Sequence, residues 1–215
     1  MKKIIYLMLF LCPLVSFGQE NGQSSYLFDD FTTGRAYLVR GGYSENLLNY
    51  DLAGERFLFL QDGEVLVLSN ADDFSSIVIG ERVFVPAREG AFRERILLPD
   101  AKSYYIRWWA DVRSKGKPAG YGGVSQTAAI DTYGSLHADG QVRNLVSGEQ
   151  FEIKLRNVYS VTVDGKEKNY TTLRSLTNIF RQHKSEIEEF VDRENINFSK
   201  PADVQRIMEF CAPFM

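Results

Sequence analysis

FLFLQDGEVLVL, residues 57–68, consists of two short apolar stretches joined by Asp62-Gly63. An Asp-Gly pair readily adopts the two positive φ angles of a type I′ turn, the tight connection typical of a β-hairpin. The stretches 159–163 and 166–170 flank Asp164-Gly165 in the same way. The sequence therefore predicts two hairpins, one in each half of the region 27–170.

Further turn signals divide the rest of this region into short segments. Gly41-Gly42, Gly80-Glu81 and Asp139-Gly140 each lie between stretches that favour strands. We expect about ten short strands between residues 27 and 170. Because tight connections join antiparallel neighbours, the pattern predicts an antiparallel meander that forms a roll, a sandwich or a partly open barrel.

The longest predicted strand is Tyr104–Arg113, and its two faces differ in character. Side chains alternate across a strand, so one set faces the core and the other does not. The predicted core face carries Tyr104, Ile106, Trp108, Ala110 and Val112. The opposite face mixes aromatic and charged groups, with Tyr105, Arg107 and Trp109 as candidate binding residues. The alternative is that a helix from the C-terminal segment covers Tyr105 and Trp109 and makes them core residues.

From residue 171 to 215 the apolar period changes from two to 3.6, which predicts helices. Thr171-Thr172 is a predicted N-cap, and a kink near 182–185 separates two helices or bends one. Ser199 is predicted to cap a last helix that has Pro201 in its first turn. We expect an α+β protein in which this helical segment packs on the β domain, and four Phe side chains are expected to dominate the contact: Phe180, Phe190, Phe198 and Phe210.

Residues 1–18 have the pattern of a secretory signal peptide. Lys2 and Lys3 precede a twelve-residue apolar stretch, and small residues at 16 and 18 predict cleavage before Gln19. The apolar stretch is shorter than the roughly 20 residues of a membrane-spanning helix. We therefore expect an exported protein of the periplasm or cell surface with no transmembrane span after cleavage, and a flexible mature N-terminus at 19–26.

Charge and cysteine content argue against several classes of function. The formal net charge is −3, and loss of the two lysines of the signal makes it −5, which argues against a nucleic-acid partner. Cleavage also removes Cys12, which leaves Cys211 with no partner for an intramolecular disulfide and a predicted role in packing. The chain has only two histidines, His137 and His183, so we predict no metal site and no cofactor.

The segment 114–134 is rich in glycine and has no strand or helix pattern of its own. Long connections inside a compact domain are usually either functional or mobile. If the segment forms an ordered binding loop, Tyr121, Ser125 and Gln126 are its candidate contact residues. The alternative is a surface connection whose glycines serve only the backbone.

Parts of the sequence resemble a family of exported proteins of Bacteroidetes-type bacteria. The resemblance rests on Leu48–Asp51, Lys117–Thr127, His183–Val191 with Asn197-Phe198, and the signal ending Phe17-Gly18-Gln19. It covers most of the mature chain. It implies export and brings no activity, cofactor or catalytic residue with it.

The sequence favours a non-enzymatic envelope protein that binds a partner protein, a peptide or a small ligand. This hypothesis rests on the aromatic and charged strand face beside a glycine-rich segment. A hydrolase with a carboxylate pair or a spatially assembled His site is the first alternative. A structural or assembly component of the cell envelope is the second. The sequence does not predict the oligomeric state.

Overall fold

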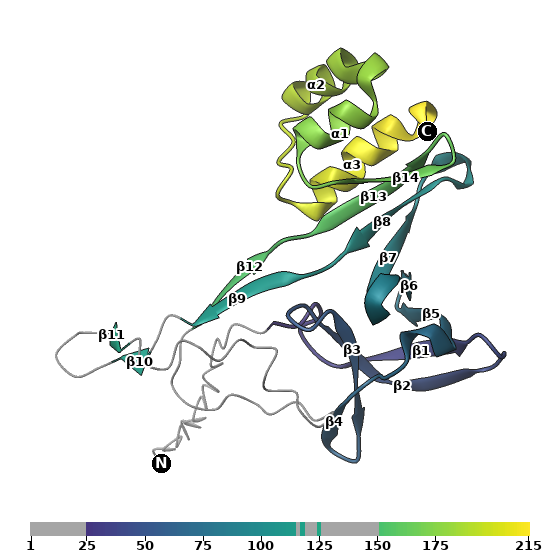
Figure 1. Cartoon of the computed structure of the whole chain (residues 1–215), viewed down its shortest axis with the longest axis vertical. Coiled ribbons are helices and arrows are strands. Elements are labelled where there is room, and N and C mark those ends of the chain that lie inside the picture. Colours follow the sequence, from purple (N-terminus) through teal and green to yellow (C-terminus); the bar gives the residue numbers. More distant parts are fainter. Residues whose placement is uncertain (1–24, 115–116, 119–123, 126–150) are drawn as a thin grey trace, which may run out of the picture.

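A computed structural model describes residues 25–114, 117–118, 124–125 and 151–215 of the chain. The regions 27–108 and 158–170 contribute the strands of the main sheet, and the last 45 residues form helices (Figure 1). The strands are β1 (Thr32–Leu38), β2 (Tyr43–Asp51), β3 (Arg56–Gln61), β4 (Glu64–Val67), β5 (Phe74–Ile79), β6 (Arg82–Pro86), β7 (Phe92–Leu97), β8 (Ser103–Arg107), β9 (Ala110–Ser114), β10 (Lys117–Pro118), β11 (Val124–Ser125), β12 (Phe151–Leu155), β13 (Val158–Val163) and β14 (Lys166–Tyr170). The helices are α1 (Leu173–Ile179), α2 (Lys184–Arg193) and α3 (Pro201–Cys211), and short 3₁₀ turns include η1 (Ala71–Asp73), η2 (Arg88–Gly90), η3 (Pro99–Ala101), η6 (Arg181–His183) and η7 (Ala212–Phe214).

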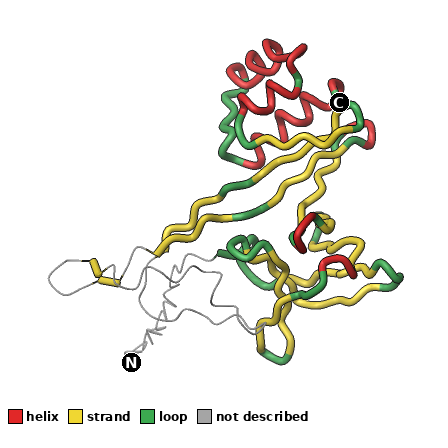
Figure 2. Tube along the Cα trace, viewed as in Figure 1, coloured by secondary structure: helices red, strands yellow, loops and turns green. Residues whose placement is uncertain are grey.

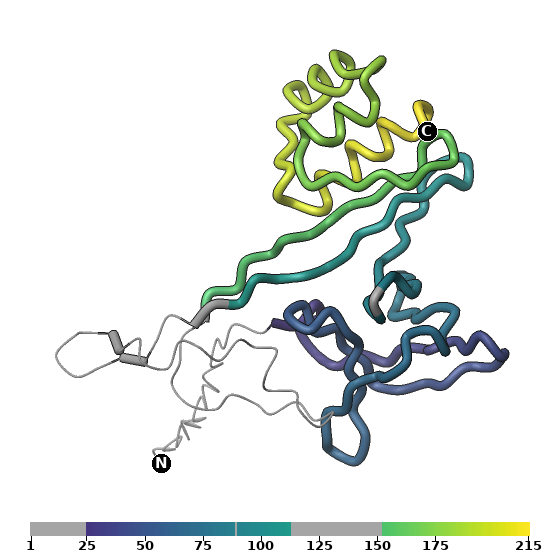
Figure 3. Tube along the Cα trace, in the orientation of Figure 1, coloured from purple at the N-terminus to yellow at the C-terminus, as the bar shows by residue number. Residues whose placement is uncertain are grey.

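Ten strands form one open sheet in the order β14-β13-β8-β7-β6-β5-β1-β2-β3-β4. Every pairing among the described strands is antiparallel, as the sequence predicted. Sequential hairpins account for most neighbours, but β5 pairs with β1 instead of β4. Figure 3 shows that the strands from the first part of the chain lie at one end of the molecule and the helices at the other.

The predicted turns occur where glycine and aspartate allow a left-handed backbone. Asp62 and Gly63 have φ values of 53° and 84°, and Asp164 and Gly165 have 55° and 69°. Positive φ at both central positions is the requirement of a type I′ turn. Gly41 and Gly42 connect β1 to β2, and Gly80 lies between β5 and β6, whereas Asp139-Gly140 lies outside the described residues.

The predicted strand Tyr104–Arg113 is divided in two at Trp108-Trp109. β8 belongs to the main sheet, and β9 leaves it to pair with β12 as a two-stranded ribbon that extends away from the sheet (Figure 2). The alternation of faces was predicted correctly for the core side, because Tyr104, Ile106, Trp108 and Ala110 are all at most 9% exposed.

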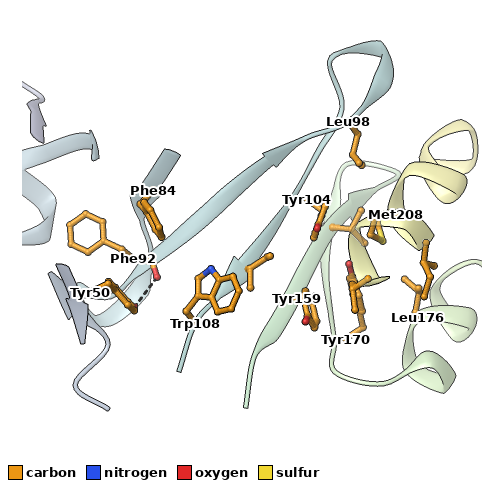
Figure 4. Close-up of a cluster of buried hydrophobic side chains, with 14 of the residues drawn as sticks. Tyr50, Phe84, Phe92, Leu98, Tyr104, Trp108, Tyr159, Tyr170, Leu176 and Met208 are labelled. Atoms are coloured by element: carbon orange, nitrogen blue, oxygen red, sulfur yellow. Dashed lines mark hydrogen bonds between the residues drawn. The ribbon is translucent and has the colours of Figure 1, made fainter. Parts of the chain in front are cut away.

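The core begins with an aromatic cluster between the strands of the first half. Phe57 makes edge-to-face contacts with Tyr50, Phe84 and Phe92 at centroid distances of 5.0–5.1 Å. The Tyr50 hydroxyl donates to the carbonyl of Phe92 at 3.3 Å (Figure 4). Such pairs combine large area burial with favourable ring electrostatics, so they stabilise this end of the sheet.

The helical segment packs on the face of the sheet that carries Tyr104, Tyr159 and Tyr170 (Figure 4). This confirms an α+β fold with a C-terminal helical cap. Of the four predicted contact aromatics only Phe180 is buried, and the other three are half-buried. The three helices also contribute apolar side chains that are 0% exposed: Leu176, Ile187, Val204, Ile207, Met208 and Cys211.

The helix ends match the sequence prediction at one position and correct it at another. The side chain of Thr172 accepts from the backbone N–H of Ser175, and the Ser175 hydroxyl accepts from the N–H of Thr172, a capping box. Ser199 does not cap the last helix, because Lys200 is the N-cap residue and its side chain makes no cap hydrogen bond. The helices α1 and α2 are separate, joined by a 3₁₀ turn at Arg181–His183.

In the described part of the chain, no helix combines the length and the apolar character that crossing a membrane requires.

Candidate functional site

A groove of about 680 Å³ crosses the sheet on the face that carries Tyr105 and Ser160. The face is defined by strand register: Tyr105 pairs with Arg95 on one side and with Ser160 on the other, and Ser160 pairs with Asn169. These residues alternate with Tyr104, Val161 and Tyr170, which are buried. The groove therefore lies on the opposite side of β8, β13 and β14 from the helices. It is lined by Asp72, Pro86, Ala87, Arg88, Arg93, Arg107, Val158, Ser160, Glu167 and Asn169.

Three arginines from three different elements line this groove. Arg88 comes from the 3₁₀ turn after β6, Arg93 from β7 and Arg107 from the end of β8. Two carboxylates, Asp72 and Glu167, also line it, so the described lining residues carry a formal net charge of +1 on a chain of −3. Guanidinium groups stay protonated in proteins, so the groove presents permanent positive charge and directed N–H donors.

Arg107 is held by a carboxylate outside the groove lining. Its Nε and Nη2 donate to the two oxygens of Glu55, with Nη2 at 3.0 Å from Oε1. Glu55 occupies the turn between β2 and β3 and has a positive φ of 52°. A bidentate pair of this kind fixes the plane of the guanidinium, so Arg107 is positioned before any ligand arrives.

Arg93 lies across the face of the sheet. Its guanidinium carbon is 3.9 Å from the centroid of the Tyr105 ring, and its Nη1 forms an ion pair with Glu167 and approaches the hydroxyl of Ser160 at 3.5 Å. The contact with the ring is a cation–π interaction. It also means that one face of Tyr105 is covered by Arg93 and is not open for stacking.

The structure brings together two of the six residues that the sequence singled out. Arg107 lines the groove, and Tyr105 lies on the same face under Arg93, which also lines it. Tyr105 is half-buried and the described helices pack on the opposite face of β8, so the predicted alternative of a core Tyr105 is not observed. Trp109 is half-buried where β8 ends, with its carbonyl accepting from the N–H of Arg156 at 2.9 Å, and it does not line the groove. Ser125 is in β11, opposite Lys117 of β10. Tyr121 and Gln126 lie outside the described residues.

No protein-family model, curated protein or solved structure matches the chain. Within the described ranges, no three His, Cys, Asp or Glu side chains cluster closely enough to hold a metal ion.

Sequence reasoning missed most of the groove: Arg88, Arg93, Ser160, Glu167 and Asn169. One signal was present, because a two-residue turn at Asp164-Gly165 fixes the pairing of Ser160 with Asn169. The pairings of β8 with β7 and with β13 had no comparable local signal. Together with the β13–β14 hairpin, they place Glu167 beside Arg93, which is 74 residues away in the sequence.

His183, the one histidine among the described residues, packs within the helical cap. The ring of His183 stacks on Phe214 with 3.8 Å between centroids, and its Nδ1 is 3.0 Å from Oε1 of Glu186. It borders a second hollow of about 580 Å³ that Lys168 and Arg181 also line. His137 lies outside the described residues.

Proposed function

We propose that the chain is an exported, non-enzymatic binding protein of the cell envelope, and that the groove over β7, β8, β13 and β14 holds its peptide, partner segment or small ligand. The observation that carries this proposal is the convergence of Arg88, Arg93 and Arg107 on one groove. Their fixed charge and planar N–H donors suit recognition of an anionic or strongly polar group.

The ion pairs around the groove support recognition as its role. Arg93 is held by Glu167 and by the Tyr105 ring, and Arg107 by both oxygens of Glu55. Side chains that are already ordered lose little conformational freedom when a ligand arrives, which favours affinity. The shape and mixed polarity of the lining suit an extended polar ligand better than a compact apolar one.

Filling the groove tests this proposal. Val158→Trp places a large ring on the groove floor, and Thr162→Trp places the same ring on the same face of β13 but outside the lining. We expect wild-type protein to bind at least one member of a panel of short peptides, amino acids and oligosaccharides by calorimetry. Val158→Trp should weaken that binding at least tenfold, and Thr162→Trp should not.

Two results would count against the proposal. Absence of binding across the panel, or equal affinity in wild-type protein and Val158→Trp, would separate the groove from ligand recognition. Conversion of a bound panel member to product, detected by mass spectrometry, would favour the hydrolase alternative.

Export itself is tested by the intact mass of protein recovered from the envelope fraction of expressing cells. This mass should correspond to a chain that begins at Gln19.

A role in envelope assembly is a second candidate, supported by exposed apolar side chains on one hairpin. Leu38, Val39, Tyr43 and Leu47 of the β1–β2 hairpin are 37–64% exposed. Exposed apolar groups that cluster on one element are typical of contact surfaces between proteins. Replacing Val39 and Tyr43 with Ser should abolish co-purification of a stoichiometric partner from native membranes if this role holds, whereas the groove variants should leave co-purification intact.

A further inference from the structure

Among the described residues, the guanidinium of Arg93 donates hydrogen bonds from one of its nitrogens only. Its Nη1 is used by Glu167 and Ser160. Its Nε is buried, and in the described part of the structure this atom has no hydrogen-bond partner. Buried donors in proteins are nearly always paired, so a buried Nε without an acceptor calls for an explanation.

The position of this atom matters because of guanidinium geometry. Arginine presents five N–H donors in a rigid plane, and the Nε–Nη2 edge donates two parallel hydrogen bonds to a planar carboxylate. Glu167 occupies Nη1 and leaves that edge without a protein acceptor among the described residues. The contact with Tyr105 covers a face of the guanidinium and not an edge, so it holds the plane of the group without competing for these donors.

We propose that the groove recognises a ligand by a carboxylate, bound through the Nε–Nη2 edge of Arg93 with Arg88 as a second cation. Because Nε has almost no accessible surface in the unliganded structure, the half-buried Arg93 side chain has to shift within the plane of its guanidinium to meet the carboxylate. This inference rests on the proposed binding function and names the chemical class of its ligand. Arg88 is exposed and forms no ion pair with another described residue, so its charge is available to the same carboxylate.

The charges around the groove favour a carboxylate over a phosphate. Asp72 and Glu167 both line the groove, and a dianionic phosphate would be repelled by both. A single negative charge matches the net charge of +1 on the lining. Neutral sugars are disfavoured because stacking on Tyr105 would require displacement of Arg93 from the ring.

Paired probes that differ only in the carboxylate test this inference. Trialanine with a free C-terminus is compared with trialanine amide, and glucuronate is compared with glucose, because a carboxylate can come from a peptide end or from a sugar acid. By calorimetry the wild-type protein should bind one of the carboxylate probes about tenfold more tightly than its neutral counterpart, the ratio expected from one charge-assisted hydrogen bond. Inorganic phosphate should bind more weakly than that carboxylate probe.

A matched pair of variants assigns the preference to Arg93. Arg93→Lys keeps the charge but removes the bidentate edge, and it should reduce the tenfold preference to below threefold. Arg95→Lys makes the same change two residues along β7, on the same face and outside the lining, and should keep the preference. Near-ultraviolet circular dichroism establishes that both variants are folded. Arg88→Gln is a second test of the carboxylate site that should leave the fold intact, because Arg88 is exposed and forms no ion pair with the described chain. This substitution should lower the carboxylate affinity several-fold.

The outcomes separate the two proposals. Binding of the neutral probes as tightly as the carboxylates, a preserved preference in Arg93→Lys, or a stronger preference for phosphate would overturn the carboxylate inference and leave the binding function standing. Failure of the wild-type protein to bind any probe, together with failure across the wider panel, would overturn both.

Discussion

Trp108 donates its indole N–H to a buried carboxylate oxygen of Glu94 at 2.7 Å. The same carboxylate accepts two hydrogen bonds of 2.7 Å from Arg82, one from Nε and one from Nη2. The Arg82 guanidinium lies 4.9–5.2 Å from the ring centroids of Phe28, Phe84 and Trp108. The Glu94 carboxylate of β7 therefore binds Arg82 of β6 and Trp108 at the end of β8, and Arg82 in turn lies against Phe28 in the segment before β1.

Glu94→Ala should destabilise the protein by about 3 kcal/mol, because it leaves Arg82 and the Trp108 N–H without their acceptor in a buried setting. The measurement is urea denaturation followed by tryptophan fluorescence. Glu188→Ala is the control, since Glu188 pairs with Lys184 while both side chains are about half exposed, and such pairs contribute little. Similar losses in the two variants would contradict a stabilising role for the Glu94 network.

Asn49 ties the segment before β1 to β2. Its side chain is 0% exposed, its amide donates to the carbonyl of Phe28 at 2.9 Å, and its oxygen accepts from the N–H of Phe28 and of Tyr50. Asn49→Leu keeps the branched shape of the side chain and leaves these backbone groups unpaired, so we expect a loss of about 3 kcal/mol.

Hydrogen exchange locates the effect of this substitution. The amides of Leu27 and Phe28 should exchange faster in Asn49→Leu, because the segment detaches from β2 before the sheet unfolds. Asn46→Leu on the same strand is the control, since the Asn46 side chain makes no hydrogen bond with other described residues. Unchanged protection of Phe28 would show that the segment is held by packing alone.

Alkaline pH should unfold the protein through buried acidic groups. Burial raises the pKa of the Cys211 thiol to about 12, and it raises the pKa of the Tyr104 and Tyr170 hydroxyls as well. An acid whose pKa is higher in the folded state loses its proton first in the unfolded state. Stability from Cys211 is therefore fully present below about pH 9 and declines as the pH rises toward 12.

Two measurements follow this effect. The free energy of unfolding should fall between pH 9 and 12, with tyrosinate absorbance appearing together with the loss of circular dichroism. At pH 8 iodoacetamide should modify Cys211 only after addition of urea, as mass spectrometry of its peptide would show. Modification of Cys211 in the native protein would mean that this part of the helical cap opens readily.

Local patterns in the sequence were sufficient to predict the class of fold. Asp62-Gly63 and Asp164-Gly165 determine their turns through backbone geometry that acts within four residues, and the change of apolar period at residue 171 marks the first helix. The division of the predicted strand at Trp108 had no local signal, because β8 and β9 pair with two different strands, β13 and β12, that lie much later in the sequence. Pairing of β5 with β1 is likewise a long-range contact with no local signal.

The groove could be predicted only in part. Alternation placed Tyr105 and Arg107 on one face, but the contribution of Arg93 depends on the pairing of β7 with β8, and that of Glu167 on the pairing of β8 with β13. Trp109 lies after the end of β8 and before β9, and it is not among the described residues that line the groove, so its role in binding stays a prediction.

Glu167 lies beside the proposed carboxylate position on Arg93 and repels a bound carboxylate, which predicts a gain of affinity when its charge is removed. Glu167 is 46% exposed and forms an ion pair with Nη1 of Arg93. A ligand carboxylate on the Nε–Nη2 edge would lie roughly 6 Å from it, where repulsion in high-dielectric surroundings is about 0.7 kcal/mol. Glu167→Gln keeps an acceptor for Nη1 and should increase the affinity for the carboxylate probe about threefold. The gain should shrink in high salt, because screening already weakens the repulsion there. If Glu167 acted mainly to orient Arg93, the same substitution would lower the affinity at every salt concentration, so the sign of the change in calorimetry decides between the two roles.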